Sequence, residues 1–177
     1  MTSTPTGYTS VAPWIVTEDT GAWLDFVTAA FDGVELGRVP LADGSIGHAE
    51  IRVGDTVLLA FDRRADWPAM PSLLRVFVPD ADAAFAASLR AGAREVTALS
   101  NSAFGQRGGR VRDPFGNIWW VTASTETVTV EEGMRRLDEP GYQEQMRYAQ
   151  ESLDAELSGR AAGQASPVVG VRFGPAS

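Results

Sequence analysis

An internal duplication constrains what this sequence can fold into more than any other feature does. Helix-like periodicity extends over 20–31 and again over 81–90, with apolar residues at i, i+3 and i+4 spacing in each stretch. A glycine closes each stretch, Gly33 or Gly92, and we expect both to adopt the left-handed conformation that stops a helix. The predicted N-caps are Asp19 or Thr20 and Asp80. The sequence therefore predicts two copies of one supersecondary unit, each with a helix that buries one face.

Strand-like runs surround the two helices in the same order. In each copy one run precedes the helix and about three follow it, so the order strand, helix, strand, strand, strand occurs twice. Turn-forming residues separate the runs that follow each helix. The predicted strands cover 8–16, 34–39, 47–53 and 56–61 in the first copy, and 73–78, a run from Arg94, 107–112 and 117–122 in the second.

The two copies together predict one domain. We expect it to cover 1–124, with modules at about 7–62 and 72–124. The segment between the modules contains two prolines and Trp67, which is typical of a linker.

The last third of the chain has a different character. Residues 125–157 predict a helical appendage. Thr129 and Glu132 resemble a capping box that opens a short helix, Pro140 is expected to interrupt it, and 142–157 predict a second, charged helix. Residues 158–177 are rich in Gly, Ala, Ser and Pro, which favours a flexible tail over an added edge strand at 168–173.

Composition excludes several classes of function. The 177-residue sequence contains no cysteine and no lysine, so disulfides, thiolate chemistry and Schiff-base catalysis are excluded. A formal net charge of −8 opposes binding to nucleic acid or to anionic lipid. No apolar run is long enough for a membrane helix, and the first charged residue is Glu18, unlike the positive flank of a signal peptide. We expect a cytoplasmic protein that binds neither nucleic acid nor membranes.

Two motifs give the repeated unit a resemblance to a known family. One is Arg112-Asp113-Pro114-Phe115-Gly116-Asn117 before the last strand, and the other is Gly47-His48-Ala49-Glu50 followed by Gly54-Asp55. Over residues 7–124 the sequence resembles the glyoxalase/bleomycin-resistance/dioxygenase superfamily, or vicinal oxygen chelate fold, and in particular its uncharacterised branch that carries demethylase names. The resemblance implies an α+β fold in which two βαβββ modules form a curved mixed sheet around a cavity, with the helices outside.

The same resemblance bears on metal binding. Metal-dependent members use four ligands, usually His or Glu, from the first and last strands of each module. Those positions are Ala12, Leu58 or Leu59, Leu73 and Trp120 in this sequence. None of these side chains can ligate a metal, so we expect no metal and no cofactor. The family's metal-assisted chemistry is not supported here, and function has to be argued from the site.

Strand alternation assigns side chains to the cavity. Between 47 and 53, His48, Glu50 and Arg52 point away from an apolar face formed by their neighbours. In the strand that begins the second module, Leu73, Arg75 and Phe77 face inward in the same way. An arginine placed inward among apolar residues needs a carboxylate partner or an anionic ligand. Arg75 is therefore a candidate ligand-binding residue, with an ion pair to Glu50 as the structural alternative.

Aromatic residues extend this predicted lining. Trp14 faces the cavity by parity with Ala12, and Trp120 does so by the family alignment. Phe77 and Trp67 are expected to contribute further, and one ring of the pair Trp119-Trp120 must be structural. An apolar pocket with a few polar groups is typical of small-molecule sites, so a flat aromatic or amphipathic ligand is expected.

Three functions are compatible with these residues. The first, which we favour, is a metal-independent binding protein that sequesters a small amphipathic or aromatic compound, as bleomycin-resistance proteins do. The second is a metal-free enzyme of the lyase or isomerase type, with His48 as general base, Glu50 orienting it and Arg75 holding an anion; His48 as a structural hydrogen-bonding group is the alternative. The third is a protein that acts through its C-terminal helices. Apolar patches and sheet edges also predict a homodimer.

Overall fold

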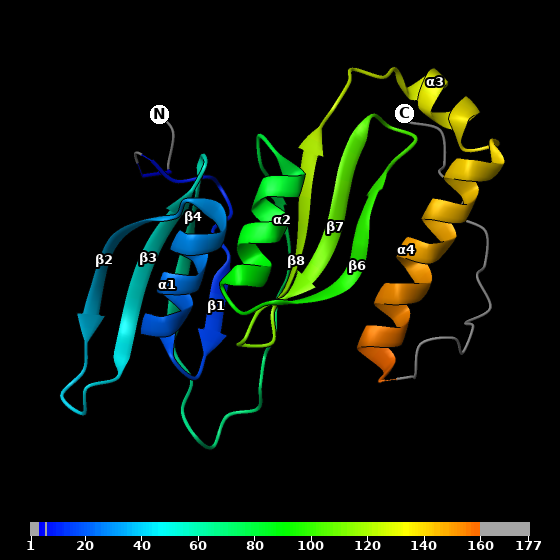
Figure 1. Ribbon diagram of the computed structural model, residues 1–177. Helices are drawn as coiled ribbons and strands as arrows, with labels where there is room; N and C mark the ends of the chain where they lie inside the picture. Colours follow the sequence, from blue (N-terminus) through cyan, green and yellow to red (C-terminus); the bar gives the residue numbers. More distant parts are fainter. Residues whose placement is uncertain (1–3, 6, 160–177) are drawn as a thin grey trace.

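Two separate four-stranded sheets organise the described part of the chain, residues 4–5 and 7–159 of the computed structural model (Figure 1). The first sheet, in the order β1-β4-β3-β2, contains β1 (Trp14–Thr17), β2 (Val34–Pro40), β3 (Ile46–Val53) and β4 (Thr56–Asp62). The second sheet, in the order β5-β8-β7-β6, contains β5 (Leu73–Phe77), β6 (Arg94–Asn101), β7 (Gln106–Arg112) and β8 (Ile118–Ser124). The predicted α+β fold of two βαβββ modules is confirmed, with sheets that do not close into a barrel.

The two sheets share one topology. In the first, β1 runs parallel to β4, and β4, β3 and β2 pair antiparallel. In the second, β5 runs parallel to β8, and β8, β7 and β6 pair antiparallel. The duplication detected in the sequence is therefore a duplication of strand order and direction.

The two helices between strands have the predicted bounds. They are α1 (Thr20–Phe31) and α2 (Ala81–Arg90). Asp19 caps α1 by accepting from the Ala22 amide at 2.9 Å, and Asp80 caps α2 by accepting from the Ala83 amide at 3.0 Å. Both aspartates are N-caps because each satisfies a first-turn N–H that has no partner within the helix.

The left-handed stop that the sequence predicts at Gly33 is wrong. Asp32 adopts that conformation, with φ of 54°, so the chain turns one residue earlier. Gly33 is required for close packing instead, because a Cβ at this position would lie 2.8 Å from Cδ1 of Ile51. At the end of α2 the prediction is confirmed, since Gly92 has φ of 102°.

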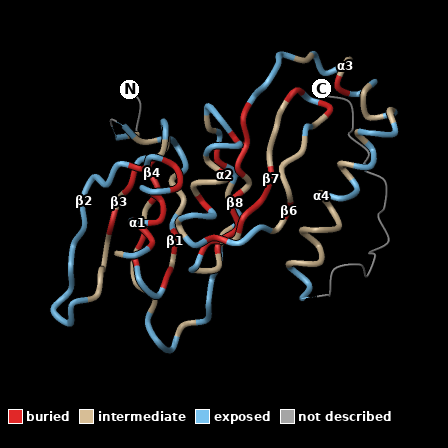
Figure 2. The backbone as a smooth tube through the Cα atoms, viewed as in Figure 1, coloured by how far each residue is buried: buried red, intermediate tan, exposed pale blue. Residues whose placement is uncertain are grey.

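The hydrophobic core lies between the helices and one face of each sheet, and Figure 2 shows this buried layer along the strands nearest the helices. In the first module Trp23 and Ile51 are fully buried within it. The modules meet where α1 packs against α2, and the ring centroids of Phe31 and Trp119 lie 4.8 Å apart. One ring of the Trp119-Trp120 pair is thus structural, as predicted.

Each sheet has an opposite face, here called its open face, that points away from α1 and α2. In β3 the buried residues Ala49 and Ile51 face the core, and His48 and Glu50 take the open face, which confirms the alternation read from the sequence. The open faces leave large apolar side chains accessible to solvent. The exposed fractions are 48% for Trp14, 59% for Leu73 and 60% for Phe77.

The turn before β8 is organised by a buried aspartate. Asp113 is 3% exposed, and its Oδ1 accepts from the backbone amides of Phe115 at 2.9 Å and Asn117 at 2.8 Å. Its Oδ2 accepts from Nδ2 of Asn117 and Nε1 of Trp119, both at 2.9 Å. The Asp-Pro-Phe-Gly-Asn motif therefore fixes the turn and the core tryptophan with a single carboxylate.

Two helices follow the second sheet, α3 (Val130–Arg136) and α4 (Pro140–Ser158). The Thr129 side chain accepts from the Glu132 amide at 3.2 Å, which confirms the predicted N-cap of α3. The second helix, predicted over 142–157, begins two residues earlier, at Pro140. Proline is tolerated at the first position of a helix because the N–H that it lacks would have no partner there. The helix α4 packs against β6.

None of the helices within the described residues is long and apolar enough to cross a membrane. The tail predicted at 158–177, with its alternative strand at 168–173, lies outside the described residues from 160 onward.

Candidate functional site

The open face of the second sheet aligns three large side chains across neighbouring strands. Arg75 of β5 pairs in register with Trp120 of β8, and Trp120 pairs in turn with Arg110 of β7. The guanidinium carbon of Arg75 lies 4.1 Å from the centroid of the Trp120 ring, and that of Arg110 lies 4.5 Å from it. One indole therefore interacts with two cations. Each cation–π contact stabilises this arrangement, and the repulsion between the two cations destabilises it.

Arg75 is exposed to solvent, and in the described part of the chain it has neutral partners only. Its Nη2 donates to Oε1 of Gln106 at 2.6 Å, its Nε donates to Oγ1 of Thr122 at 3.4 Å, and its guanidinium carbon lies 4.8 Å from the centroid of Phe77. The sequence-based alternative paired Arg75 with Glu50, but these residues lie on different sheets and have different partners. Burial lowers the pKa of Arg75, because a neighbouring carboxylate does not offset the loss of water.

Arg110 is 7% exposed and links the sheet to the C-terminal helix. Its Nη1 donates to Oγ1 of Thr97 at 3.2 Å and to the carbonyl oxygen of Ala149 in α4 at 2.6 Å. Burial lowers the pKa of Arg110, and the positive charge of Arg75 lowers it further. In the described part of the chain, neither arginine has a carboxylate within ion-pair distance.

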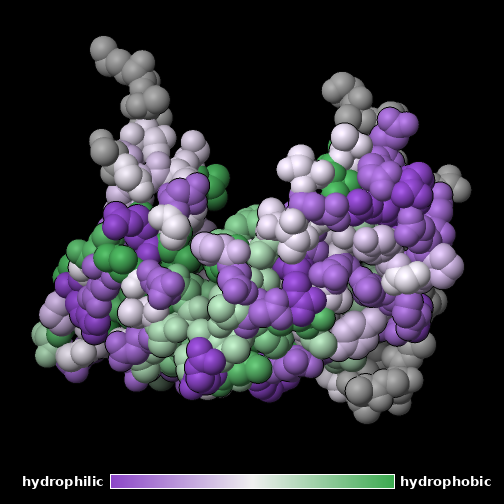
Figure 3. All heavy atoms as spheres, turned by 45° about the horizontal axis from the view of Figure 1, so that its top comes forward, coloured by the Kyte–Doolittle hydropathy of each residue, from purple (hydrophilic) through white to green (hydrophobic). Residues whose placement is uncertain are grey.

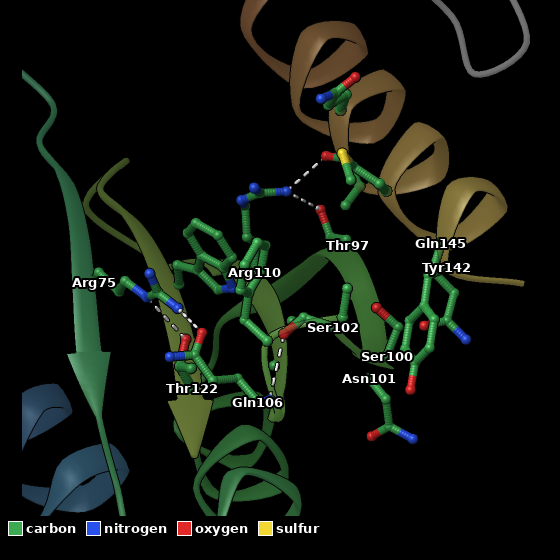
Figure 4. A pocket seen from close by; sticks show the side chains of 18 of the residues that line it. Arg75, Thr97, Ser100, Asn101, Ser102, Gln106, Arg110, Thr122, Tyr142 and Gln145 are labelled. Carbon is green, nitrogen blue, oxygen red and sulfur yellow. Dashed lines mark hydrogen bonds between the residues drawn. The ribbon is translucent and has the colours of Figure 1, made fainter. Parts of the chain in front are cut away.

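A cavity of about 280 Å³ lies beside this arrangement, between the open face of the second sheet and α4 (Figure 4). The sheet contributes the polar groups of Arg75, Gln106 and Arg110 together with the Trp120 ring. The appendage contributes the opposite wall, which is formed by Leu137, Tyr142, Gln145, Met146, Ala149 and Gln150. The site therefore combines a cationic floor with a mostly apolar wall, and within the described residues no carboxylate lines it.

Gly108 keeps the floor of this cavity open. A Cβ at this position would lie 2.7 Å from the carbonyl oxygen of Val121 and 3.1 Å from Nε1 of Trp120. Any side chain on Gly108 would therefore displace either the β8 backbone or the Trp120 ring. Because Gly108 has no side chain, the Trp120 indole can lie between the two arginines.

The open face of the first sheet carries a separate polar cluster. Oε1 of Glu50 lies 2.9 Å from Nε2 of His48, and Oε2 of Glu50 accepts from the Tyr8 hydroxyl at 2.5 Å. The hydrogen bond from Tyr8, followed by that from His48, lowers the pKa of Glu50. The same contact raises the pKa of Tyr8, because phenolate beside carboxylate is unfavourable. Glu50 is thus an ionised acceptor for both neighbours.

An aromatic row lies next to that cluster. The Trp14 ring lies 5.5 Å from His48 and 5.3 Å from Phe61, and Phe61 lies 6.0 Å from Trp67, measured between centroids. Trp14 and Trp67 were predicted to line the ligand cavity. They lie instead beside His48 and Phe61 of the first module, away from the cavity under α4. The residues predicted to line one cavity form two groups within a single chain. His48, Glu50 and Trp14 lie on the first sheet, with Trp67 beside them in the segment between β4 and β5, and Arg75, Phe77 and Trp120 lie on the second sheet.

Sequence reasoning missed Arg110 and the wall supplied by α4. Alternation along β7 could have found Arg110, because it shares a face with Gln106 and pairs with Trp120. No local signal could have placed Tyr142 or Gln145 there. The docking of α4 depends on contacts between residues that are far apart in the sequence, such as that between Arg110 and Ala149.

The donor set does not fit a metal of the kind that family members use. Leu73 and Trp120 lie on the second sheet, Leu58 and Leu59 lie on the first, and Ala12 precedes β1. Among residues 4–5 and 7–159, no group of three His, Asp or Glu side chains is close enough to hold a metal ion. His48 and Glu50 alone would supply two ligands.

The sequence profile of the Glyoxalase/Bleomycin resistance protein/Dioxygenase superfamily matches residues 8–121, from before β1 to within β8. The chain belongs to this superfamily. An uncharacterized protein of Mycobacterium tuberculosis (strain ATCC 25618 / H37Rv) is 38% identical over 138 residues, which cover 70% of this chain and 79% of that protein. The superfamily match ends before α3 and α4.

Solved structures of other proteins have a similar fold. TioX from Micromonospora sp. ML1 is 25% identical, with a TM-score of 0.54 over 68% of this chain and 100% of TioX. A protein from Pseudomonas aeruginosa is 20% identical, with a TM-score of 0.56 over 67% of this chain and 99% of that one. The fosfomycin resistance protein FosX from Mesorhizobium loti is 14% identical, with a TM-score of 0.50 over 77% of this chain and 100% of FosX.

Proposed function

We propose that this member of the superfamily binds, without a metal, a small amphipathic or aromatic molecule that carries an acidic group. The binding site is the cavity between the second sheet and α4, with Arg75 and Trp120 among its ligand-contacting residues. Phe77, which the sequence also suggested, does not line this cavity and lies against the Arg75 guanidinium at 4.8 Å. Binding would sequester the compound and so protect the cell, which is a role compatible with a superfamily that includes a fosfomycin resistance protein.

The observation that carries this proposal is the pair of arginines on one indole ring. Two guanidinium groups share Trp120 and have no carboxylate partner in the described part of the chain, although like charges repel. Arg110 is a buried cation, and a buried cation without a counterion is costly, whereas Arg75 is exposed to solvent. A ligand anion would lower the cost at Arg110 and accept charge-assisted hydrogen bonds from both guanidinium groups. The apolar residues of the α4 wall would then surround the rest of the ligand.

The proposal is tested with matched acids and amides. We expect benzoate, phenylacetate or 3-phenylpropionate to bind measurably by isothermal titration calorimetry, and the corresponding neutral amides to bind at least tenfold more weakly, because only the acids offer a charge to the arginines. Equal affinity for acids and amides, or binding of neither, would contradict it. Mass spectrometry of the recovered probe separates binding from turnover.

A second candidate function rests on the His48–Glu50 contact of 2.9 Å. A carboxylate that holds one imidazole nitrogen leaves the other available as a general base, and the alternative is therefore a metal-free lyase or isomerase. Within a single chain, however, His48 and Arg75 lie on different sheets, so this chemistry does not have the anion holder that the sequence suggested. A chemically altered probe would favour this alternative.

We also propose a homodimer, on the basis of two exposed apolar surfaces. The edge strand β2 and the residue after it expose Val34, Leu36, Val39 and Leu41. The open faces expose Trp14, Leu73 and Phe77. Figure 3 shows apolar side chains gathered over the half of the molecule that holds the first sheet and the packed helices, and hydrophilic ones over α3 and α4. A second copy would cover such surfaces, because long exposed edges otherwise invite aggregation.

Sedimentation velocity tests the oligomeric state. At micromolar concentration we expect a single species with twice the mass of the chain. Replacing Leu36 and Val39 on the edge strand with glutamate would tell whether β2 forms the contact. A monomer in the unmodified protein would contradict the proposal.

A further inference from the structure

We propose that α4 sets the specificity of the cavity by selecting ligands that carry a hydrogen-bond donor at a distance from their acidic group. The inference rests on the proposed function, because it assumes that the cavity takes an acidic ligand. It adds a second recognition point, the Gln145 carboxamide on α4, which lies outside the part of the chain that matches the superfamily.

The C-terminal half of α4 is held to the second sheet by polar contacts. Oγ of Ser152 lies 2.7 Å from Oγ1 of Thr97, and the Tyr148 hydroxyl accepts from the Ala98 amide at 3.2 Å. Glu156 forms ion pairs with Arg94 and Arg112. These contacts fix the direction of the helix, although none of the described residues of α4 is buried.

The N-terminal half of α4 crosses the cavity instead of packing on the sheet. Tyr142, Gln145 and Met146 line the cavity wall, and Figure 4 shows Tyr142 and Gln145 on the α4 side, next to Ser100 and Asn101 of β6 and across the view from Arg75. The C-terminal half of α4 is held to the sheet and the N-terminal half is separated from it by the cavity. Side chains of the described residues do not fill this space, so a ligand can enter it.

Gln145 presents an unsatisfied acceptor within this wall. Its Oε1 is buried and has no hydrogen-bond partner in the described part of the chain. Buried acceptors are normally paired, and because Gln145 is itself a lining residue of the cavity, a rotation of its side chain would bring this acceptor to an N–H or O–H of the ligand. A leucine of similar size would leave no unpaired acceptor at this position in the ligand-free protein, so the described fold does not require the carboxamide.

Arg110 connects the two recognition points. The same guanidinium lies over Trp120 on the floor and donates to the carbonyl oxygen of Ala149, one turn along α4 from Gln145. The acid-binding end and the donor-binding end are therefore held in a fixed relation. The ligand class that fits both ends is a small acid with an apolar or aromatic body and a hydroxyl or amide N–H at its far end.

The experiment compares aryl acids with and without a terminal hydroxyl at three lengths. The pairs are 4-hydroxybenzoate with benzoate, 4-hydroxyphenylacetate with phenylacetate, and 3-(4-hydroxyphenyl)propionate with 3-phenylpropionate. In the unmodified protein we expect at least one hydroxylated acid to bind about five- to tenfold more tightly than its partner, which is the effect of one additional neutral hydrogen bond.

Two leucine substitutions on α4 locate the effect. Gln145→Leu should remove the preference for the hydroxyl, keep the affinity for the acids without a hydroxyl, and leave the melting temperature unchanged or higher. Gln143→Leu is the matched control, because Gln143 is exposed on the same helix and does not line the cavity, and it should keep the preference. A preference that persists in Gln145→Leu would overturn the inference, as would a lower melting temperature without a change in preference.

The two proposals fail in different ways. If no acid binds, the proposed function fails and the role of α4 fails with it. If acids bind in an Arg75-dependent manner but the three hydroxylated acids show no advantage, the proposed function stands and the inference about Gln145 is overturned.

Discussion

Replacing Asp113 with alanine is expected to lower the free energy of unfolding by about 3–5 kcal/mol. The carboxylate is the acceptor for four donors: the amides of Phe115 and Asn117, Nδ2 of Asn117 and Nε1 of Trp119. Alanine would leave all four without this partner in a buried turn, and each unsatisfied buried donor costs about 1–3 kcal/mol when water cannot replace it. The loss should appear as a lower denaturation midpoint in urea with an unchanged slope.

Two further variants give this prediction its controls. Asp113→Asn keeps one acceptor oxygen but presents an amide to two donors, so we expect an intermediate loss. Asp55→Ala changes an exposed aspartate in a turn of the first module, where among the described residues the carboxylate accepts only from the neighbouring Thr56 hydroxyl at 3.1 Å. It should change the free energy of unfolding by no more than about 0.5 kcal/mol. A loss below about 1 kcal/mol in Asp113→Ala would mean that the turn does not depend on the carboxylate.

The features that sequence reasoning predicted are those with local causes. The bounds of α1 and α2 follow from apolar spacing and from aspartates that bind first-turn amides. The alternation in β3 follows from the period of two in any strand, which separates His48 and Glu50 from Ala49 and Ile51. These patterns are complete within about ten residues, so they can be recognised without knowing what packs against them.

The features that it missed depend on residues distant in the sequence. Gly33 resembles a helix stop, but its small size is required by Ile51, a contact that becomes visible only when β3 lies against α1. Arg110 was not singled out because its importance comes from Trp120 on the next strand and Ala149 on α4. The expected cavity combined groups from two sheets that, within a single chain, do not close around one space.

Arg75→Gln is expected to weaken binding of phenylacetate and the other acid probes by about ten- to hundredfold, which corresponds to about 1.5–3 kcal/mol for a charge-assisted hydrogen bond. Arg75 is a cleaner test than Arg110, because Arg110 also holds α4 to the sheet and its loss would disturb the cavity itself. Calorimetric titration of both proteins with each acid and its amide measures the effect. The weak affinity for the amides should not change, because they present no charge to the lost guanidinium.

Stability distinguishes this functional role of Arg75 from a structural one. The positive charge of Arg75 lowers the pKa of Arg110, so the two cations repel each other, and removing one should leave the melting temperature of the ligand-free protein unchanged or raise it. If Arg75 instead supports the fold through Trp120, Phe77 and Gln106, the melting temperature should fall while acid affinity stays the same. Arg64→Gln is the matched control, since Arg64 also lies over a tryptophan, 5.5 Å from the centroid of Trp67, but on an exposed segment far from α4 in the sequence. It removes the same charge, so an equal loss of acid affinity in both variants would assign the effect to net charge and not to a binding site.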